Sequence, residues 1–524
     1  MAAVSMRLSD VMMMLAYASD LATGHSRDFA LKSCVVAMRI VGLAGLDARV
    51  ARDAYHLSLL RYVGCNADTH VLSGLFGDEI ALRRELVGLD MGNRAELGKV
   101  FTRAFQRLYF DLDPAAQEKA VAEGLGQALA VARPVLTAHC EVARRIGERL
   151  GLAEEISRNL GQIYERWDGK GLPNGLSGEA VLPAVRVVTL AQDVIALSDE
   201  LGPEEMARIV ASRGDGPYEA ALAGLVADHA ADLVAGIGPT VEREEILALE
   251  PAPHVVMDEA AAEEAFRAIA DMIDMRMPFT YGHSRGVSEL AAAAGRDCGL
   301  PEADLRALRW AGLVHDVGEL VVPVSTWMRV GPLSARERDA AHLHPYYGER
   351  ALAAFGADGA AMAALVLRHH ERLDGSGYHR KVTGADLSPA ARILAAAEAF
   401  QTAREERPHR HAAAPEAAAA RLRAAVRDGE LCAEASEAVL KVAGQPSRRA
   451  TPRALAGMTP REIEVLRLVA AGLTAKEAGR RLDLSPKTVD HHIQSIYGKI
   501  GVTTRAAAAL YAVEHGLLRA GEGA

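Results

Sequence analysis

Residues Leu313–Leu320 read LVHDVGEL, in which an adjacent His315 and Asp316 are surrounded by apolar side chains. Removing a carboxylate from water is unfavourable by several kcal/mol unless a counter-charge or a metal ion offsets the desolvation. The doublet therefore raises the hypothesis of a buried metal site in this part of the chain.

Imidazole and carboxylate groups recur in the neighbouring sequence, between and within segments with helical apolar spacing. The candidates are His283, His344, His369, His370, Asp374 and Glu398. Neutral imidazoles together with a carboxylate suit a first-row divalent metal ion. An acid that bridges two such ions would allow a binuclear site that activates water for attack on a phosphoryl group. A lone histidine on a helix is usually a core or solvated residue, but two doublets, HD and HH, favour the metal interpretation.

Four short texts occur in order between about Phe266 and Arg410: HDVGE, HPYYGERAL, HHERLDGSGYH and ARILAAAE. Together they resemble the HD superfamily of metal-dependent phosphohydrolases, and more narrowly its HD-GYP branch. The resemblance implies hydrolysis of cyclic di-GMP, with two divalent ions, Fe or Mn, as cofactors and Asp316 as the bridging carboxylate. The implied metal ligands are His283, His315, Asp316, His344, His369, His370 and Glu398. Asp316 and Asp374 are the catalytic candidates, although the DGSG text around Asp374 is equally typical of a tight turn.

Three positions depart from the pattern of that branch. Glu319 stands where the family has a lysine that can meet a substrate phosphate, which replaces attraction of an anion by repulsion. His379 replaces the proline of the GYP motif, and Phe279 stands where some members have an acid, which favours two ions over three. The sequence therefore leaves open whether the site hydrolyses a nucleotide or only senses it.

An internal comparison indicates that this module is duplicated. TGHSRD at residues 23–28 is similar to YGHSRG at residues 281–286, and YERWDGKGLP at residues 164–173 is similar to HERLDGSGYH at residues 370–379. The span from Gly64 to His139 is longer than its counterpart, which predicts a helical insertion in the first copy.

The first copy lacks most of the candidate ligands. In our alignment Gly64-Cys65 takes the place of the His-Asp doublet, Ile163-Tyr164 that of the His doublet and Gln192 that of Glu398, which leaves His25 and His139. Two imidazoles without a carboxylate cannot hold a catalytic pair of divalent ions. We expect this copy to pack against the active one, or to bind a ligand without cleaving it.

Helix boundaries can be read directly from the C-terminal segment. Thr459 with Glu462, and Thr474 with Glu477, form two capping boxes, and Ser485 precedes a third helix that ends at Gly501. Two helices joined by a short turn are typical of the helix-turn-helix motif. On the third helix an apolar face lies opposite a polar one, and the polar face is suited to a DNA groove.

The text MTPREIEVLRLVAAGLTAKEAGRRLDLSPKTVDHHIQSIYGKIGV at residues 458–502 resembles the tetrahelical DNA-binding domain of the LuxR/FixJ type. The polar face and the resemblance together nominate Lys487, Thr488, His491, His492, Gln494 and Lys499 as DNA-binding residues. Asp490 stands where that family usually has a lysine, and an acid near phosphates weakens affinity or accepts from a cytosine amino group.

Charge is distributed unevenly along the 524 residues. The formal net charge is −10, whereas the segment from Gly444 onward has 12 Lys or Arg against 7 Asp or Glu. This excludes a protein that coats nucleic acid along its whole length and favours an anionic partner, double-stranded DNA, at the C-terminus. Five scattered cysteines indicate a reducing compartment, and no apolar run is long enough to span a bilayer. We expect a cytoplasmic homodimer without a membrane partner.

The sequence thus predicts an all-α protein: a degenerate HD-type module at residues 1–240, an HD-GYP-like metal-binding module at residues 255–443 and a LuxR-type helix-turn-helix domain at residues 458–524. The preferred function is a transcription regulator whose body senses or hydrolyses a cyclic di-GMP-like nucleotide. The alternative is a metal-dependent cyclic di-GMP phosphodiesterase whose tail serves only for localisation.

Overall fold

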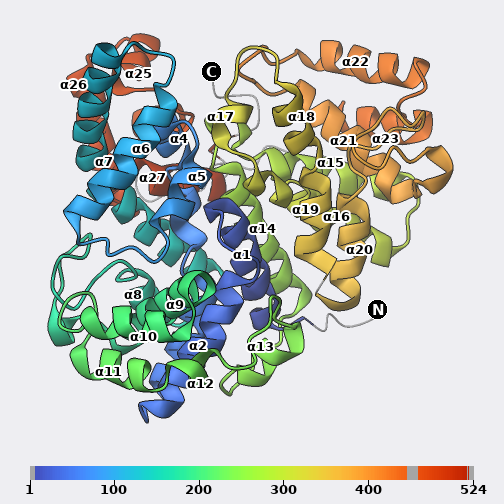
Figure 1. Ribbon diagram of the computed structural model, residues 1–524. Coiled ribbons are helices and arrows are strands. Elements are labelled where there is room, and N and C mark those ends of the chain that lie inside the picture. Colours follow the sequence, from blue (N-terminus) through green and yellow to red (C-terminus); the bar gives the residue numbers. More distant parts are fainter. Residues whose placement is uncertain (1–5, 354, 445–457, 516, 519–524) are drawn as a thin grey trace. The chain divides into compact units, whose positions relative to one another are not determined.

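A computed structural model of the chain describes residues 6–353, 355–444, 458–515 and 517–518, and these residues form helices and connecting loops without any β-strand (Figure 1). The all-α prediction is therefore confirmed. The chain divides into two compact units, one that ends at Asp258 and one that begins at Glu259. Among the described helices, none combines the length and the apolar character that crossing a bilayer requires.

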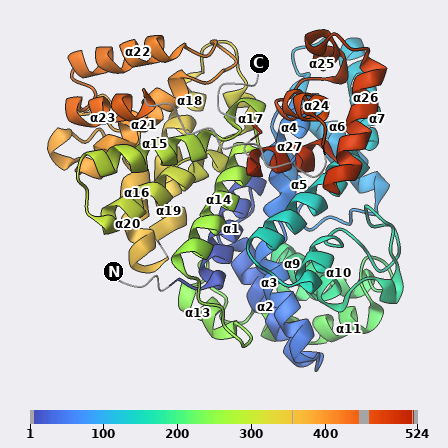
Figure 2. The same cartoon turned by 180° about the vertical axis from the view of Figure 1, so that it is seen from behind.

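The unit from Glu259 contains the HD text within a cluster of helices. Its α-helices up to residue 444 are α14 Glu259–Asp274, α15 His283–Asp297, α16 Glu302–Val314, α17 Val324–Trp327, α18 Ala335–His342, α19 His344–Ala353, α20 Gly356–Val366, α21 Pro389–Ala403, α22 Pro415–Arg427 and α23 Ala433–Ala443. Three 3₁₀ turns join them: η3 Pro278–Thr280, η4 Val317–Val321 and η5 Gly384–Asp386. Helix α15 packs against α16, α21 and α23, and α19 packs against α20 and η4 (Figure 2). This packing brings residues distant in sequence to the centre of the unit.

The first unit is built from a longer series of helices. These are α1 Leu8–Thr23, α2 Phe29–Leu43, α3 Ala48–Leu60, η1 Val63–Asn66, α4 Thr69–Phe76, α5 Glu79–Leu86, α6 Arg94–Leu108, α7 Pro114–Arg149, α8 Glu154–Leu160, η2 Gly178–Ala180, α9 Pro183–Leu201, α10 Pro203–Ser212, α11 Ala220–Asp228, α12 Ala230–Val234 and α13 Arg243–Leu249. Helices α2, α3 and α9 pack against one another. The run VMMMLAYA lies within α1, and its side chains are almost all buried.

The residues between Gly64 and His139, predicted to be an insertion, lie mostly in helices. Helices α4 to α6 and the first half of α7 enclose a separate apolar cluster, which includes Phe76, Phe105 and Val121. The rings of Phe76 and Phe105 stack with their centroids 4.8 Å apart. The insertion therefore has a hydrophobic core of its own beside that of the unit that carries it.

The DNA-binding segment consists of α24 Pro460–Ala470, α25 Ala475–Leu482, α26 Pro486–Ile500 and α27 Arg505–Glu514. Both predicted capping boxes form, with Thr459 on Glu462 and Thr474 on Glu477, because each side chain satisfies a backbone N–H that the first helical turn leaves free. A Cβ at Gly479 would lie 2.6 Å from the Leu484 carbonyl oxygen, so the tight turn between α25 and α26 requires glycine there.

Candidate metal centre and nucleic-acid interface

Six elements of the second unit position the predicted ligands at a helix end or on an inward face. His283 is the first residue of α15, His315 follows α16, Asp316 precedes η4, His344 begins α19, His369 and His370 follow α20, and Glu398 lies within α21. His283, His315, His344 and His369 are at most 1% exposed. The structure thus brings all seven predicted metal ligands together at the centre of one helical unit.

Asp316 lies between two pairs of histidines. Its Oδ2 is 3.4 Å from Nε2 of His283 and 3.2 Å from Nε2 of His315. Its Oδ1 is 3.5 Å from Nε2 of His344 and 3.5 Å from Nε2 of His369. The two oxygens of one carboxylate therefore face two separate imidazole pairs, which is the arrangement that a bridging ligand requires.

Hydrogen bonds to the backbone define the tautomers of three of these histidines. Nδ1 of His315 is 2.9 Å from the Gly312 carbonyl oxygen, Nδ1 of His344 is 2.7 Å from that of Ala341, and Nδ1 of His369 is 2.6 Å from that of Val366. A carbonyl oxygen can only accept, so each Nδ1 carries a hydrogen, and in the neutral ring Nε2 is left with a lone pair.

The Nε2 atoms of the four buried histidines face one another in two pairs. Nε2 of His344 and Nε2 of His369 are 3.0 Å apart, and Nε2 of His283 and Nε2 of His315 are 3.2 Å apart. Two unprotonated nitrogens at that distance repel unless a proton or a metal ion lies between them. Two nitrogens bound to one ion at about 2.1 Å are separated by roughly 3.0–3.4 Å, so the geometry of both pairs fits metal binding.

Charge in the cage also favours a cation. Although burial opposes ionisation, His315 and His283 hold the pKa of Asp316 well below its usual range, and His283 does the same for Glu398. Burial by itself disfavours a charged His315, yet Asp316 and Glu398 together raise the pKa of His315 to about 10. Buried anions that attract a proton so strongly attract a metal ion in its place, and binding of the metal ion then displaces protons.

Glu398 completes the first of the two pairs. Its Oε2 is 3.1 Å from Nε2 of His283 and 3.3 Å from Nε2 of His315, and its Oε1 accepts from the Thr402 hydroxyl at 2.6 Å. His283, His315, Asp316 and Glu398 therefore form one set of donors, called here the first metal position. Asp316, His344, His369 and His370 form the other, called here the second metal position.

Sequence reasoning missed one acid of this region, Glu405, which is fully buried although it lies in the charged text REERPH. Its Oε2 is 2.8 Å from Nδ1 of His283. No local signal in the text distinguishes this glutamate from the neighbouring Glu406. The turn after α21 alone brings it inside.

Asp374, a catalytic candidate, lies outside both metal positions. Its side chain is exposed, and its Oδ1 accepts from the backbone N–H of Ser376 at 2.9 Å, while Gly375 takes a φ of 78°. These features are those of a tight turn. The catalytic role of Asp374 stays a prediction.

Glu319, one of the positions that depart from the HD-GYP pattern, is buried beside Asp316, and Tyr378 lies beside the second metal position. Burial and then the neighbouring Asp316 carboxylate raise the pKa of Glu319 to about 7. The ring of Tyr378 stacks on His342 at 4.1 Å and lies 4.4 Å from His370. Within the described part of the chain, neither ring nitrogen of His379 has a hydrogen-bond partner. An aromatic wall therefore borders the second metal position.

Corresponding close contacts occur inside each unit. A Cβ on Gly318 would lie 1.9 Å from the His344 carbonyl oxygen, and a Cβ on Gly64 would lie 1.9 Å from the His139 carbonyl oxygen. Gly64 therefore corresponds to Gly318, and the His-Asp doublet corresponds to Arg61-Tyr62. The alignment of that doublet with Gly64-Cys65 was wrong by three residues, because no histidine or aspartate remained there to anchor it.

The loop after the His doublet also has the same hydrogen bonds in both units. Glu371 accepts from the backbone N–H groups of Arg380 and Val382, and Glu165 accepts from those of Asn174 and Leu176. Both pairs are separated by the same number of residues. The loops around Asp374 and Asp168 therefore share this pair of hydrogen bonds, although the Leu172–Pro173 peptide of the first unit is cis and its counterpart is not.

In the first unit, Tyr62, Gln192 and Tyr164 lie in the region that corresponds to the metal positions of the second. The Tyr62 hydroxyl donates to Oε1 of Gln192, and the Tyr164 hydroxyl lies 3.2 Å from both the Cys65 thiol and Nδ1 of His139. Burial lowers the pKa of His139 to about 3, so this imidazole is neutral. This part of the first unit is thus a buried network of hydroxyl, thiol, imidazole and amide groups.

The polar face of α26 is accessible in the DNA-binding segment. Lys487, His491 and Gln494 are exposed, whereas Val489 and Ile496 are buried against the other helices. Thr488 and His492 are half-buried, and the Thr488 backbone N–H donates to the Ser485 hydroxyl that caps α26. The predicted apolar and polar faces of this helix are both observed.

Lys499, one of the DNA-binding candidates, forms an ion pair within the domain. Its Nζ lies 2.6 Å from Oε2 of Glu462, whose Oε1 also accepts from the Ser495 hydroxyl. Lys499 can reach a phosphate only if this ion pair opens.

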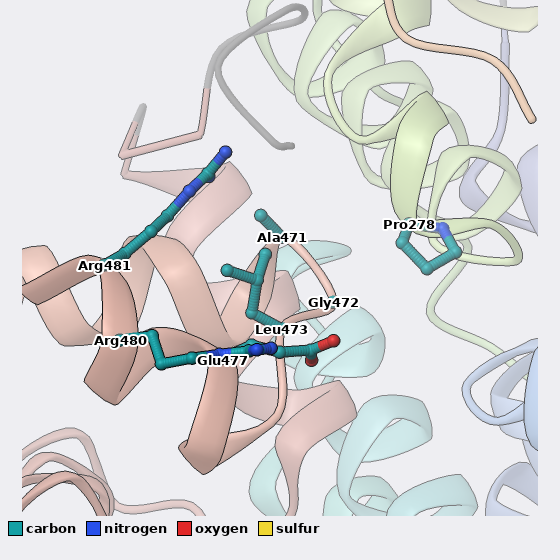
Figure 3. A pocket seen from close by; sticks show the side chains of 7 residues that line it. All are labelled: Pro278, Ala471, Gly472, Leu473, Glu477, Arg480 and Arg481. Carbon is teal, nitrogen blue, oxygen red and sulfur yellow. The ribbon is translucent and has the colours of Figure 1, made fainter. Parts of the chain in front are cut away.

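Arg480 and Arg481, which sequence reasoning did not nominate, project from the preceding helix α25 close to Glu477 and the turn Ala471–Leu473 (Figure 3). Both arginines are exposed, as is Lys476. Basic side chains on the two helices of the motif could have been found by mapping charge on the predicted helix-turn-helix.

Comparison with known proteins agrees with both sites. Residues 267–431 match the HD domain family, and residues 456–512 match the luxR family of bacterial regulatory proteins. The 3'3'-cGAMP-specific phosphodiesterase 3 of Vibrio cholerae is 25% identical over 415 residues, which are 77% of this chain and 88% of that protein. The cyclic di-GMP phosphodiesterase response regulator RpfG of Xanthomonas campestris is 32% identical over 165 residues, 31% of this chain and 44% of that protein.

The fold is also found among solved structures. The crystal structure of a cyclic GMP-AMP specific phosphodiesterase from V. cholerae, V-cGAP3, superimposes with a TM-score of 0.56 at 21% identity. The match covers 84% of this chain and 99% of that one, so the likeness in fold extends beyond the HD domain to most of both chains.

Fold, ligand cluster and family match together identify residues 267–431 as an HD domain, a class of metal-dependent phosphohydrolase domain. This chain joins such a domain, related to cyclic-dinucleotide phosphodiesterases, to a DNA-binding domain of the luxR family.

Proposed function

We propose that the protein is a transcription regulator whose HD domain binds and hydrolyses a cyclic dinucleotide, and that the state of this site alters DNA binding. The observation that carries the proposal is the convergence of two imidazole pairs on the two oxygens of Asp316, in a chain that ends in a luxR-type domain. The relatives named above act on 3'3'-cGAMP or cyclic di-GMP, which gives the class of ligand.

The donor sets fit two divalent ions, for which Fe and Mn are the candidates. Four donors are available at each metal position, and mixed imidazole and carboxylate ligands suit these metals. When bound, such ions polarise a phosphoryl oxygen and activate water for in-line attack.

The residues of the chain orient this chemistry. The backbone carbonyls of Gly312, Ala341 and Val366 hold three imidazoles with Nε2 directed into the cage. The ring of Tyr378 packs between His342 and His370 and so supports His370 at the second metal position.

The first unit is proposed to be a degenerate copy of the second that supports folding and does not cleave the ligand. The shared glycine contacts and the shared loop hydrogen bonds support common ancestry of the two units. The replacement of the His-Asp doublet by Arg61-Tyr62 removes the bridging carboxylate without which a pair of ions is not held.

On the DNA side, we propose that Lys487, His491 and Gln494 face the major groove, with Arg480 and Arg481 near the phosphate backbone. A glutamine can make a bidentate contact with adenine, and arginine is suited to phosphate. One helix-turn-helix makes few base contacts, so we propose that a homodimer reads two half-sites.

The experiment measures metal content, turnover and DNA affinity of the full chain. His315→Ala should abolish bound metal, whereas His25→Ala, a histidine substitution in the first unit, should leave it unchanged. Metal loss in both variants would contradict the assignment of the site to the second unit.

Titration of operator DNA with and without cyclic di-GMP or 3'3'-cGAMP then tests the coupling, which must be reciprocal if it exists. Cleavage of the nucleotide with no change in DNA affinity would support the alternative, an enzyme whose tail serves only to localise it.

A further inference from the structure

Glu405 is a buried acid that belongs to neither metal position yet contacts one of its ligands. Its side chain is fully buried, and it lies two residues beyond the end of α21. Both of its oxygens are within hydrogen-bond distance of Nδ1 of His283, at 3.1 Å for Oε1 and 2.8 Å for Oε2. A buried charge of this kind is unfavourable unless its partners compensate it.

The partners of Glu405 are all donors. Nε2 of Gln401 donates to its Oε1 at 2.7 Å, and the Arg407 guanidinium donates to its Oε2 at 2.8 Å. A carboxyl group whose oxygens receive only N–H donors is an acceptor, so Glu405 is a carboxylate. It follows that Nδ1 of His283 carries the hydrogen and that Nε2 presents its lone pair to the cage.

His283 is oriented differently from its neighbours. His315, His344 and His369 each donate from Nδ1 to a neutral carbonyl oxygen of their own helical turn. His283 instead donates to an anion 122 residues away in sequence. An anionic partner makes the opposite ring nitrogen a stronger ligand than a neutral carbonyl does.

We propose that Glu405 is a positioning residue that orients His283 and makes the first metal position the tighter of the two. The inference rests on the two-ion site of the proposed function. At the first metal position, two carboxylates, Asp316 and Glu398, act directly and a third, Glu405, acts through His283. The second metal position has Asp316 as its one carboxylate among the donors identified.

The surroundings of Glu405 are built to hold it. A Cβ on Gly286 would lie 2.7 Å from the Gln401 side-chain amide, so the glycine in the text GHSRG leaves room for the amide that donates to Glu405. The Arg407 guanidinium also contacts the Phe279 ring from 5.2 Å, which places it against a second element. Glu405 is therefore held from two sides in the position where it meets His283.

The test is a titration of chelator-stripped full-length protein with Mn²⁺, in competition with a chelating dye that resolves two binding steps. Glu405→Gln retains the shape but removes the charge, and it should weaken the tighter step by about 10- to 100-fold while the weaker step changes little. Asp193→Asn is the matched control, because Asp193 is a buried carboxylate of the first unit that accepts from Tyr218. This control should leave both steps unchanged.

Glu405→Asp provides a second variant in case the glutamine variant does not fold. The charge remains, but the shorter side chain draws the carboxylate away from Nδ1 of His283, so the tighter step should weaken here as well. Metal binding equal to wild type in a folded Glu405→Gln or Glu405→Asp variant would overturn the role of Glu405, while the two-ion site would stand. Absence of Mn²⁺ binding to the wild-type chain would overturn the proposed metal site itself, and the inference with it.

Discussion

Replacing Gly318 by alanine should both destabilise the second unit and reduce its metal binding. The new Cβ would lie 1.9 Å from the His344 carbonyl oxygen, and real contacts of this kind essentially never fall below 3.0 Å. Turn η4 and helix α19 must therefore move apart by about 1.1 Å. Because the obstacle is backbone, which cannot rotate away as a side chain does, we expect a destabilisation of about 3 kcal/mol.

The same displacement should disrupt the cage. Asp316 is two residues from Gly318, and its Oδ1 lies 3.5 Å from Nε2 of His344. Metal–ligand distances tolerate only about 0.2 Å of deviation, so a shift of about 1.1 Å prevents one carboxylate from serving both positions. Elemental analysis of purified Gly318→Ala should find at least one of the two ions lost.

Gly64→Ala is the matched control, since its Cβ would meet the His139 carbonyl oxygen at the same 1.9 Å. It should lower the melting temperature of the first unit by about 6–12 °C for a loss of about 3 kcal/mol, yet keep the metal. Full metal content in Gly318→Ala, or equal metal loss in both variants, would refute the reasoning.

Three further outcomes are expected. Glu319→Lys should increase turnover of cyclic di-GMP, because it restores a positive charge for the phosphate; a steady-state assay in which the lysine variant is slower than wild type would contradict this. Lys487→Ala and Gln494→Ala should each weaken specific DNA binding by about 1–3 kcal/mol in a fluorescence titration, if each side chain makes a bidentate or equivalent contact with a base; unchanged affinity would place these residues away from DNA. Lys499, then Ser495, lower the pKa of Glu462 from its usual 4.5 to about 2, so the stabilisation is present above pH 4.5 and is lost as the pH falls from there toward 2. Because the Lys499 side chain is 32% exposed, solvent screening leaves about 1–2 kcal/mol of this stabilisation. We expect the urea midpoints of wild type and Glu462→Gln to differ at pH 6 but not at pH 2. An equal difference at both pH values would argue against an ion-pair contribution of Glu462.

Much of the DNA-binding domain could be predicted from the sequence because its signals are local. A capping box joins residues three apart, so Thr459 with Glu462 and Thr474 with Glu477 mark helix starts wherever the helices finally pack. The apolar face of α26 follows from the helical repeat alone, and Val489 and Ile496 are buried as that repeat predicts. The candidate metal ligands were also predictable, because the doublets HD and HH, set among apolar helical residues, are typical of a buried metal site.

Interactions between residues distant in the chain were decided only by the tertiary structure. Glu405 reads as one of two adjacent surface acids, and only the turn after α21 places it against His283. The match of Gly64 to Gly318 was hidden in the sequence, because the contact that identifies it is made with a carbonyl oxygen distant in the chain. Lys499 reads as a free cation until the packing of α24 and α26 brings Glu462 to it. Local patterns thus specified helix ends and ligand types, whereas the packing of helices determined which charged groups meet. The reason is that a buried ion pair or a steric contact depends on distances in space, which no spacing in sequence encodes.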